Sequence, residues 1–111
     1  MGKAEREKGA SAEREVAALL TAAGFPATRN ARNGISAEDV AHAIPGVYLE
    51  VKRRETTKIW EWIFQAKVGA KIGVVQTENL RTPVVVFRRN RSEWLACLPF
   101  ADLIELLPRD G

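Results

Sequence analysis

The sequence predicts a single α/β domain in which a central mixed β-sheet of about five strands is flanked by helices. Three observations lead to this fold class. Apolar residues recur at helical spacing in separate segments, apolar and polar residues alternate strictly over residues 47–53, and clusters of Gly, Pro and Asn separate these segments. The expected order is α-β-β-β-α-β-β-α, and a length of 111 residues fits one domain.

The first helix is expected to begin at Ser11, a residue type that caps helices, and to end at Ala23 before Gly24. Its apolar stripe is made of Val16, Leu19, Leu20 and Ala23. Residues 1–9 are polar and charged, so we expect them to form a flexible basic arm in front of this helix.

Three short strands are expected next, at residues 25–29, around 39–43 and at 47–53. The loop at 30–36 separates the first two strands and contains Asn33-Gly34, the strongest turn signal in the chain. In the third strand, successive side chains point to opposite faces. One face carries Val47, Leu49 and Val51, and the other carries Tyr48, Glu50 and Lys52.

The second half of the chain predicts a helix, two strands and a last helix. The helix covers residues 58–72, with Thr57 as its cap. Its apolar face is made of Ile59, Trp62, Ile63 and Ala66. Residues 83–88 and 93–98 are expected to pair as strands around a turn at 89–92, and residues 100–107 form a short amphipathic helix.

The charge distribution favours a polyanionic partner. The chain has 17 Lys and Arg residues against 14 Asp and Glu, and the basic excess lies in residues 1–91, whereas residues 92–111 are net acidic. A basic surface of this kind supplies non-specific affinity for DNA phosphates. Charge alone is equally compatible with an ordinary solvated surface.

The sequence also argues against several classes of protein. Cys97 is the only cysteine, so no disulfide forms within one chain, which favours a reducing compartment. No apolar run is long enough to span a membrane, and residues 1–8 lack the apolar core of a signal peptide. We therefore expect a cytoplasmic protein with neither a membrane partner nor a small-molecule cofactor.

The segment with the clearest chemistry is Asp39, followed after ten residues by Glu50-Val51-Lys52. Glu50 and Lys52 share one face of a strand, and Asp39 on a neighbouring strand would meet Glu50. Two close carboxylates repel each other unless a cation lies between them, and Mg²⁺, with Mn²⁺ as a substitute, suits oxygen ligands. Such a site polarises a phosphate, while Lys52 offsets the developing charge. The spacing alone is equally compatible with a surface ion pair.

Three stretches resemble the PD-(D/E)xK nuclease superfamily and, within it, the archaeal-type Holliday-junction resolvases. Residues 8–15 (KGASAERE) are similar to the family's K-G-S-x-x-E-R-E segment, and the helix that follows ends in a Gly-Phe pair, Gly24-Phe25. Glu38-Asp39-Val40 stands where the family has Pro-Asp-hydrophobic, and residues 49–52 (LEVK) stand where it has its Glu-x-Lys strand. Later in the chain, residues 94–107 resemble the final strand and short helix seen in many nucleases of this class.

This resemblance implies a restriction-endonuclease-like core and a defined set of site residues. Asp39, Glu50 and the Val51 carbonyl would hold the metal, with Glu13 approaching it from the first helix. Lys52 would act on the attacking water or on the phosphate. The resemblance further implies a homodimer that nicks two strands of a four-way DNA junction and leaves 5′-phosphates.

Contacts to DNA are expected from two groups of residues. The resemblance implies Lys8, Arg14, Ser36 and Gln65. Position and charge add Arg29 and Arg32, which flank the turn-rich loop, and Arg53 and Arg54, which extend the basic run past Lys52. For this second group, a solvated loop or strand end is the alternative explanation.

Two positions depart from the family pattern. Glu38 replaces the proline and would add a third carboxylate near the metal, and Ala10 interrupts the Gly-Ser pair. These departures put the preferred DNA structure in doubt and leave the catalytic residues intact.

Several other residues have a structural and a functional interpretation. Trp62 fits the buried stripe of the second helix, whereas Trp60 and Phe64 lie on other faces and suit edge packing, a dimer interface or a wedge against junction bases. We expect His42 to be structural and Cys97 to be a buried strand thiol.

Two other functions remain open on the sequence alone. One is a nuclease of the same superfamily with another substrate, such as a restriction-like, repair or nicking enzyme. The other is a DNA-binding module with a decayed site, against which the presence of Asp39, Glu50 and Lys52 argues.

Overall fold

The computed structural model describes residues 3–30, 38–72, 74 and 80–109. The elements follow the order that the sequence predicts. They are α1 (Lys3–Ala22), β1 (Ala27–Arg29), β2 (Val40–His42), β3 (Val47–Arg53), α2 (Ile59–Lys71), β4 (Thr82–Arg88), β5 (Leu95–Cys97) and α3 (Phe100–Leu106). No helix in these described ranges is long and apolar enough to cross a membrane.

The strands form two small sheets, which corrects the prediction of one continuous five-stranded sheet. β1 and β2 pair antiparallel as a two-stranded sheet. β3, β4 and β5 form a mixed sheet in that order, with β3 parallel to β4 and β4 antiparallel to β5. The register of β3 and β4 places Glu50 beside Val85 and Lys52 beside Phe87.

Two adjacent carboxylates explain why β2 does not continue the larger sheet. Glu38 Oε2 accepts the Leu49 N–H at 2.7 Å, and Asp39 Oδ2 accepts the Val51 N–H at 2.8 Å. β3 is the edge strand of its sheet, so these alternate N–H groups are the ones that another strand would otherwise pair. Side-chain oxygens therefore join the two sheets where a backbone ladder was expected.

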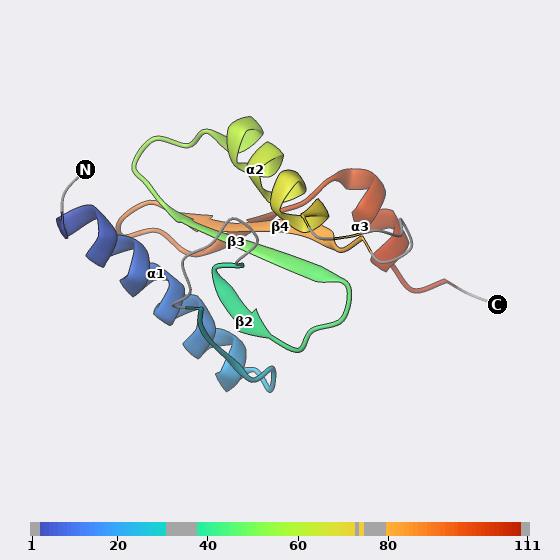
Figure 1. The fold of residues 1–111 in the computed structure, drawn as a ribbon, viewed down its shortest axis with the longest axis horizontal. Coiled ribbons are helices and arrows are strands. Elements are labelled where there is room, and N and C mark those ends of the chain that lie inside the picture. The colour runs from blue at the N-terminus through green and yellow to red at the C-terminus, as the bar shows by residue number, and fades with distance from the viewer. Residues whose placement is uncertain (1–2, 31–37, 73, 75–79, 110–111) are drawn as a thin grey trace.

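Helices α1 and α2 cover opposite faces of the β3–β4 pair (Figure 1). On the α1 face, the buried core is made of Ala12, Val16, Ala17, Val40, Leu49 and Val51. On the α2 face, Trp62 and Ala66 pack with Val85, and Trp62 also meets Phe87 with ring centroids 5.7 Å apart. Because side chains alternate along β3, Glu50 and Lys52 lie on the α2 face.

Helix α1 begins eight residues earlier than predicted. Lys3 starts the helix, so residues 3–9 are helical where we expected a flexible arm, and Ser11 lies exposed inside the helix, not at its cap. Ala, Glu, Lys and Arg dominate this stretch and have high helix propensity. Lys3 and Glu7 also form an i,i+4 ion pair at 3.8 Å.

The end of α1 agrees with the prediction. Gly24 has φ +99°, and Phe25 donates its N–H to the Leu20 carbonyl at 2.8 Å, which is the Schellman arrangement. The predicted apolar stripe is only half right, since Val16 is buried and Leu20 packs against the core, whereas Leu19 is 54% exposed and Ala23 is also exposed.

The other helices differ from the prediction at their ends and in their packing. Lys58, and not Thr57, precedes α2, and it makes no side-chain capping bond. Helix α3 has no buried residue. Cys97 is half-buried, which corrects the expectation of a fully buried thiol, because β5 lies at the edge of its sheet.

Candidate active site

Strand β3 holds a carboxylate and an ammonium side by side. Lys52 Nζ lies 3.5 Å from Glu50 Oε2, and each side chain is only 17% exposed. Their neighbours on β4 are apolar, Val85 and Phe87. Strand alternation thus gives the Glu-x-Lys pair that the sequence predicts, in surroundings that are poor in water.

Asp39 and Glu50 face a common space. Both line a hollow of about 340 Å³ between β3 and α2. The other lining residues are Tyr48, Phe64, Gln65, Val68, Gly69 and Ile72. The structure therefore brings together the two carboxylates that were predicted to meet, and it places Gln65 in the same hollow.

Glu13 reaches this group from α1. Its Oε1 accepts the Arg29 Nε–H at 2.9 Å, and its carboxyl is close enough to Asp39 for the two charges to interact. Burial raises the pKa of Glu13, and the Asp39 charge raises it further, while Arg29 opposes the change.

The other two carboxyls also have raised pKa values. Burial is the main cause at Asp39, and the Val51 N–H and the Lys52 charge oppose it. Burial and the Asp39 charge raise the pKa of Glu50 to about 7, against the pull of Lys52. With all three carboxyls ionised, the site would carry more negative charge than Lys52 and Arg29 neutralise, so a bound cation would favour the ionised forms.

Asp39 and Glu50 could supply two ligands to Mg²⁺, but the part of the protein that the structure describes does not surround the ion with a full set of ligands. Within the described ranges, no group of three or more Asp, Glu, His or Cys side chains is arranged to hold a metal ion. Mg²⁺ keeps several waters and is often bound by one or two carboxylates, which Asp39 and Glu50 supply. The Val51 carbonyl lies on the same edge of β3 as its N–H, which faces Asp39.

Glu38 is not part of this site, which corrects the expectation of a third carboxylate near the metal. Its Oε1 binds Arg81 at 2.7 Å, and its Oε2 binds His42 Nε2 at 2.7 Å. His42 Nδ1 accepts the Ile44 N–H at 3.0 Å, so Nε2 carries the proton that is donated to Glu38. The structural role predicted for His42 agrees with these contacts.

Tyr48 and Gly69 are residues of the site that sequence reasoning missed. Tyr48 is 3% exposed, and a Cβ added at Gly69 would lie 2.6 Å from its Cζ. Gly69 therefore lets α2 approach the Tyr48 ring closely. Burial, followed by the charges of Glu50 and Asp39, raises the pKa of Tyr48 to about 12. A glycine inside a helix was the available signal.

The residues predicted to contact DNA lie in different environments. Lys8 is half-buried, Arg14, Arg54 and Gln65 are exposed, and Arg53 binds the Asn90 side chain at 3.1 Å. Arg29 contacts the cluster of carboxylates through its ion pair with Glu13. Arg32 and Ser36 lie outside the described residues.

A second acidic residue of α1, Glu15, has a different role. It accepts hydrogen bonds from Arg88 Nη2 at 3.1 Å and from Trp94 Nε1 at 3.0 Å, and Arg88 stacks 5.1 Å from the Trp94 ring centroid. Although partial burial opposes it, these bonds hold the pKa of Glu15 below its ordinary value. Glu15 therefore ties α1 to β4 and the segment before β5.

The arrangement suits chemistry on a phosphate ester. It combines carboxylates able to bind a hard cation, a lysine beside them and an open hollow in front. No family model, curated protein or solved structure matches this chain.

Proposed function

We propose that the chain is a Mg²⁺-dependent endodeoxyribonuclease. The observation that carries this proposal is that Asp39 and Glu50 line one hollow beside Lys52, with Glu13 within electrostatic reach of both carboxyls. A carboxyl at position 50 does not help the protein to fold, because burial raises the pKa of Glu50 to about 7 and its charged form lowers the stability. Strongly shifted groups in a hollow are typical of functional sites.

Each residue has a role in phosphodiester hydrolysis. Asp39, Glu50 and the Val51 carbonyl would hold Mg²⁺, which supplies Lewis-acid polarisation of the phosphate and lowers the pKa of a bound water. Lys52 offsets the negative charge that develops on the phosphate oxygens. The water oxygen bonds to phosphorus and the bond to the 3′-oxygen breaks, which leaves a 5′-phosphate and a 3′-hydroxyl.

Glu13 and Arg29 act on Asp39 from the side of α1. Burial raises the pKa of Asp39, and Glu13 opposes part of that rise, which favours the ionised form that binds a cation. Arg29, held at 2.9 Å from Glu13, keeps the Glu13 carboxyl oriented. We assign to this pair the positioning of Asp39.

For the substrate, we propose a four-way DNA junction cut by a homodimer in recombination or repair. The resemblance of residues 8–15, Asp39 and residues 49–52 to archaeal-type Holliday-junction resolvases supports this, as does the basic excess in residues 1–91. We also propose that α1, α2 and the β3–β4–β5 sheet form a restriction-endonuclease-like core, which the mixed pairing and the two covered faces support.

A cleavage panel tests the proposal. Wild-type protein with Mg²⁺ is incubated with a four-way junction, a flap and a linear duplex of matched sequence. We expect paired nicks in the junction, and Glu50→Gln is expected to bind it without cutting. Equal cutting of the duplex would replace the junction specificity with a broader nuclease of the same superfamily.

A non-catalytic DNA-binding module is the second candidate. It is favoured by the Arg29–Glu13 ion pair at 2.9 Å and by the lack, within the described residues, of three side chains arranged around a metal position. If the wild type binds the junction and cuts none of the three DNAs with Mg²⁺ or Mn²⁺, this second function replaces the first.

A further inference from the structure

Helix α2 exposes two large aromatic side chains on one side. Trp60 is 84% exposed and Phe64 is 66% exposed, whereas Trp62 on the opposite side is 5% exposed. Residues four apart on a helix are neighbours, so the two exposed rings lie in line. Together they form an aromatic ridge that contributes nothing to the core.

Basic residues continue the same line. Lys67 and Lys71 follow Phe64 at spacings of three and four, and both are exposed. Helix α3 is a useful contrast, because its exposed apolar residues Phe100 and Ile104 are accompanied by acidic Asp102 and Glu105, whereas α2 has one acidic residue, Glu61, against its two lysines. The α2 ridge thus offers flat apolar surfaces and positive charge together, which suits a nucleic acid strand.

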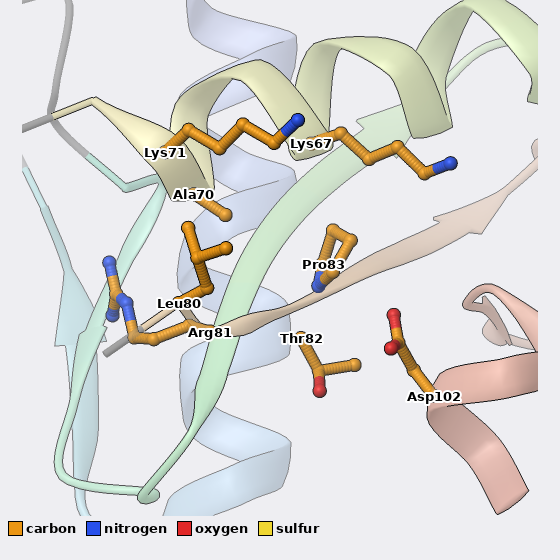
Figure 2. A pocket seen from close by; sticks show the side chains of 8 residues that line it. All are labelled: Lys67, Ala70, Lys71, Leu80, Arg81, Thr82, Pro83 and Asp102. Atoms are coloured by element: carbon orange, nitrogen blue, oxygen red, sulfur yellow. The ribbon is translucent and has the colours of Figure 1, made fainter. Parts of the chain in front are cut away.

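The ridge lies between two hollows. Phe64 lines the hollow that contains Asp39 and Glu50. Lys67 and Lys71 line another hollow of about 270 Å³ on the other flank of α2. Figure 2 shows both lysines extending along α2 above this second hollow, with the Asp102 carboxylate reaching toward it from α3.

We propose that Trp60 and Phe64 form a stacking platform for unpaired bases next to the phosphate that is cut. Lys67 and Lys71 bind the phosphates of the same strand. This proposal rests on the proposed nuclease function and adds that bases near the cleavage position of its branched DNA substrate are unpaired when the protein binds them. A base within a continuous duplex is already stacked on its neighbours, so its face is not free to bind the platform.

The test is a binding ratio measured in EDTA, where no cleavage occurs. The probes are a fluorescein-labelled duplex with a gap of a few unpaired nucleotides and a continuous duplex of the same length. Loss of one stacked base changes affinity by about 5- to 150-fold. We expect Trp60→Ala to lose at least the lower value on the gapped probe and to leave duplex affinity unchanged.

Two control variants separate stacking from a general effect of the substitution. Trp60→Phe keeps an aromatic face and should retain most of the gapped-probe affinity. Phe100→Ala removes an aromatic residue that is 74% exposed on α3 and should change neither affinity. Both positions are exposed, and far-ultraviolet circular dichroism checks that each of the three variants is folded.

Three results would overturn the platform. They are an unchanged affinity of Trp60→Ala for the gapped probe, an equal loss of affinity on both probes, and a lower mass of free Trp60→Ala than of free wild type by analytical ultracentrifugation, which would make the ridge a contact between copies of the chain. Cleavage with Mg²⁺ is scored separately. If the wild type cuts DNA and Trp60→Ala keeps the preference for the gapped probe over the duplex, only the platform is refuted. If the wild type cuts no DNA, the nuclease is refuted, and the binding ratio still decides whether the platform exists.

Discussion

The Asp39 carboxylate accepts the backbone N–H of Val51 at 2.8 Å, so a residue that we assign to the metal also joins β2 to β3. Removing its charge and removing its hydrogen bond should therefore have different effects. Asp39→Asn keeps an acceptor for Val51, whereas Asp39→Ala leaves a buried N–H without a partner, which costs about 1–3 kcal/mol. Chemical denaturation measures the difference, and cleavage should be lost in both variants. Equal stability of the two would mean that the bond does not hold the strands together.

The raised pKa of Glu50 makes stability depend on pH. In the unfolded chain Glu50 loses its proton near its ordinary value of 4.5, whereas in the folded chain it does so at about 7. Stability therefore falls as pH rises from about 4.5 to 7, by up to about 3 kcal/mol. Glu50→Gln should remove this part of the slope and be the more stable protein at pH 8.

Glu105→Gln is the matched control for that measurement, since the Glu105 side chain is 76% exposed and its ion pair among the described residues is with surface Arg109 at 3.5 Å. Its unfolding free energy should follow the wild type from pH 5 to 8. A Glu50→Gln variant that also follows the wild type would show that Glu50 does not carry the pH dependence.

A bound cation should restore the stability that the protein loses when Glu50 is ionised. At pH 8 without DNA, Mg²⁺ at ten times its dissociation constant stabilises the folded protein by about 1.4 kcal/mol. Thermal unfolding with and without Mg²⁺ measures this gain, and Glu50→Gln should lose most of it. The same gain in both proteins would place the ion elsewhere.

Glu13 and Glu15 both lie on α1, and each pairs with an arginine from a strand, Arg29 and Arg88. Replacing each glutamate by glutamine should have opposite effects on cleavage and on stability. Glu13→Gln should reduce cleavage by about 10- to 100-fold, because it acts next to the metal residues, with little loss of stability. Glu15→Gln should cost about 1 kcal/mol of stability, since it weakens the bonds to Arg88 and Trp94, and leave the cleavage rate within about twofold. Similar effects of the two substitutions on cleavage would argue against the site.

Gly69 should not tolerate alanine. Replacing glycine by alanine inside a helix usually stabilises it by about 0.5–1 kcal/mol. At Gly69 the new Cβ would collide with the Tyr48 ring, so the sign reverses and the hollow is distorted. Gly9→Ala in α1 is the control, because nothing lies within 4 Å of that Cβ, and it should be stabilising. Denaturation curves of both variants decide the matter.

The order of the elements could be predicted because it depends on local patterns. Alternation fixed the faces of β3, and helical spacing found Trp62 and Ala66. The start of α1 could not be placed, because a polar stretch of good helix formers and a flexible arm have the same composition.

The division of the sheet could not be predicted from sequence, because it depends on contacts between distant residues. Glu38 is diverted from the site by Arg81, which is 43 positions away, and by the Leu49 N–H. A carboxylate next to Asp39 offers no sign in the sequence of which donor it will meet. The close approach of Tyr48 to Gly69 likewise depends on how α2 is seated on the sheet.

The carboxylate bridges between β2 and β3 determine which acidic residues would remain in related sequences that had lost the proposed activity. Selection for a folded protein alone would retain Glu38 and Asp39, because they satisfy the edge of β3. It would discard Glu50, whose charge is a burden without a cation. In related sequences, an acidic residue at the position of Glu50 would therefore be a better marker of the proposed activity than an aspartate at the position of Asp39.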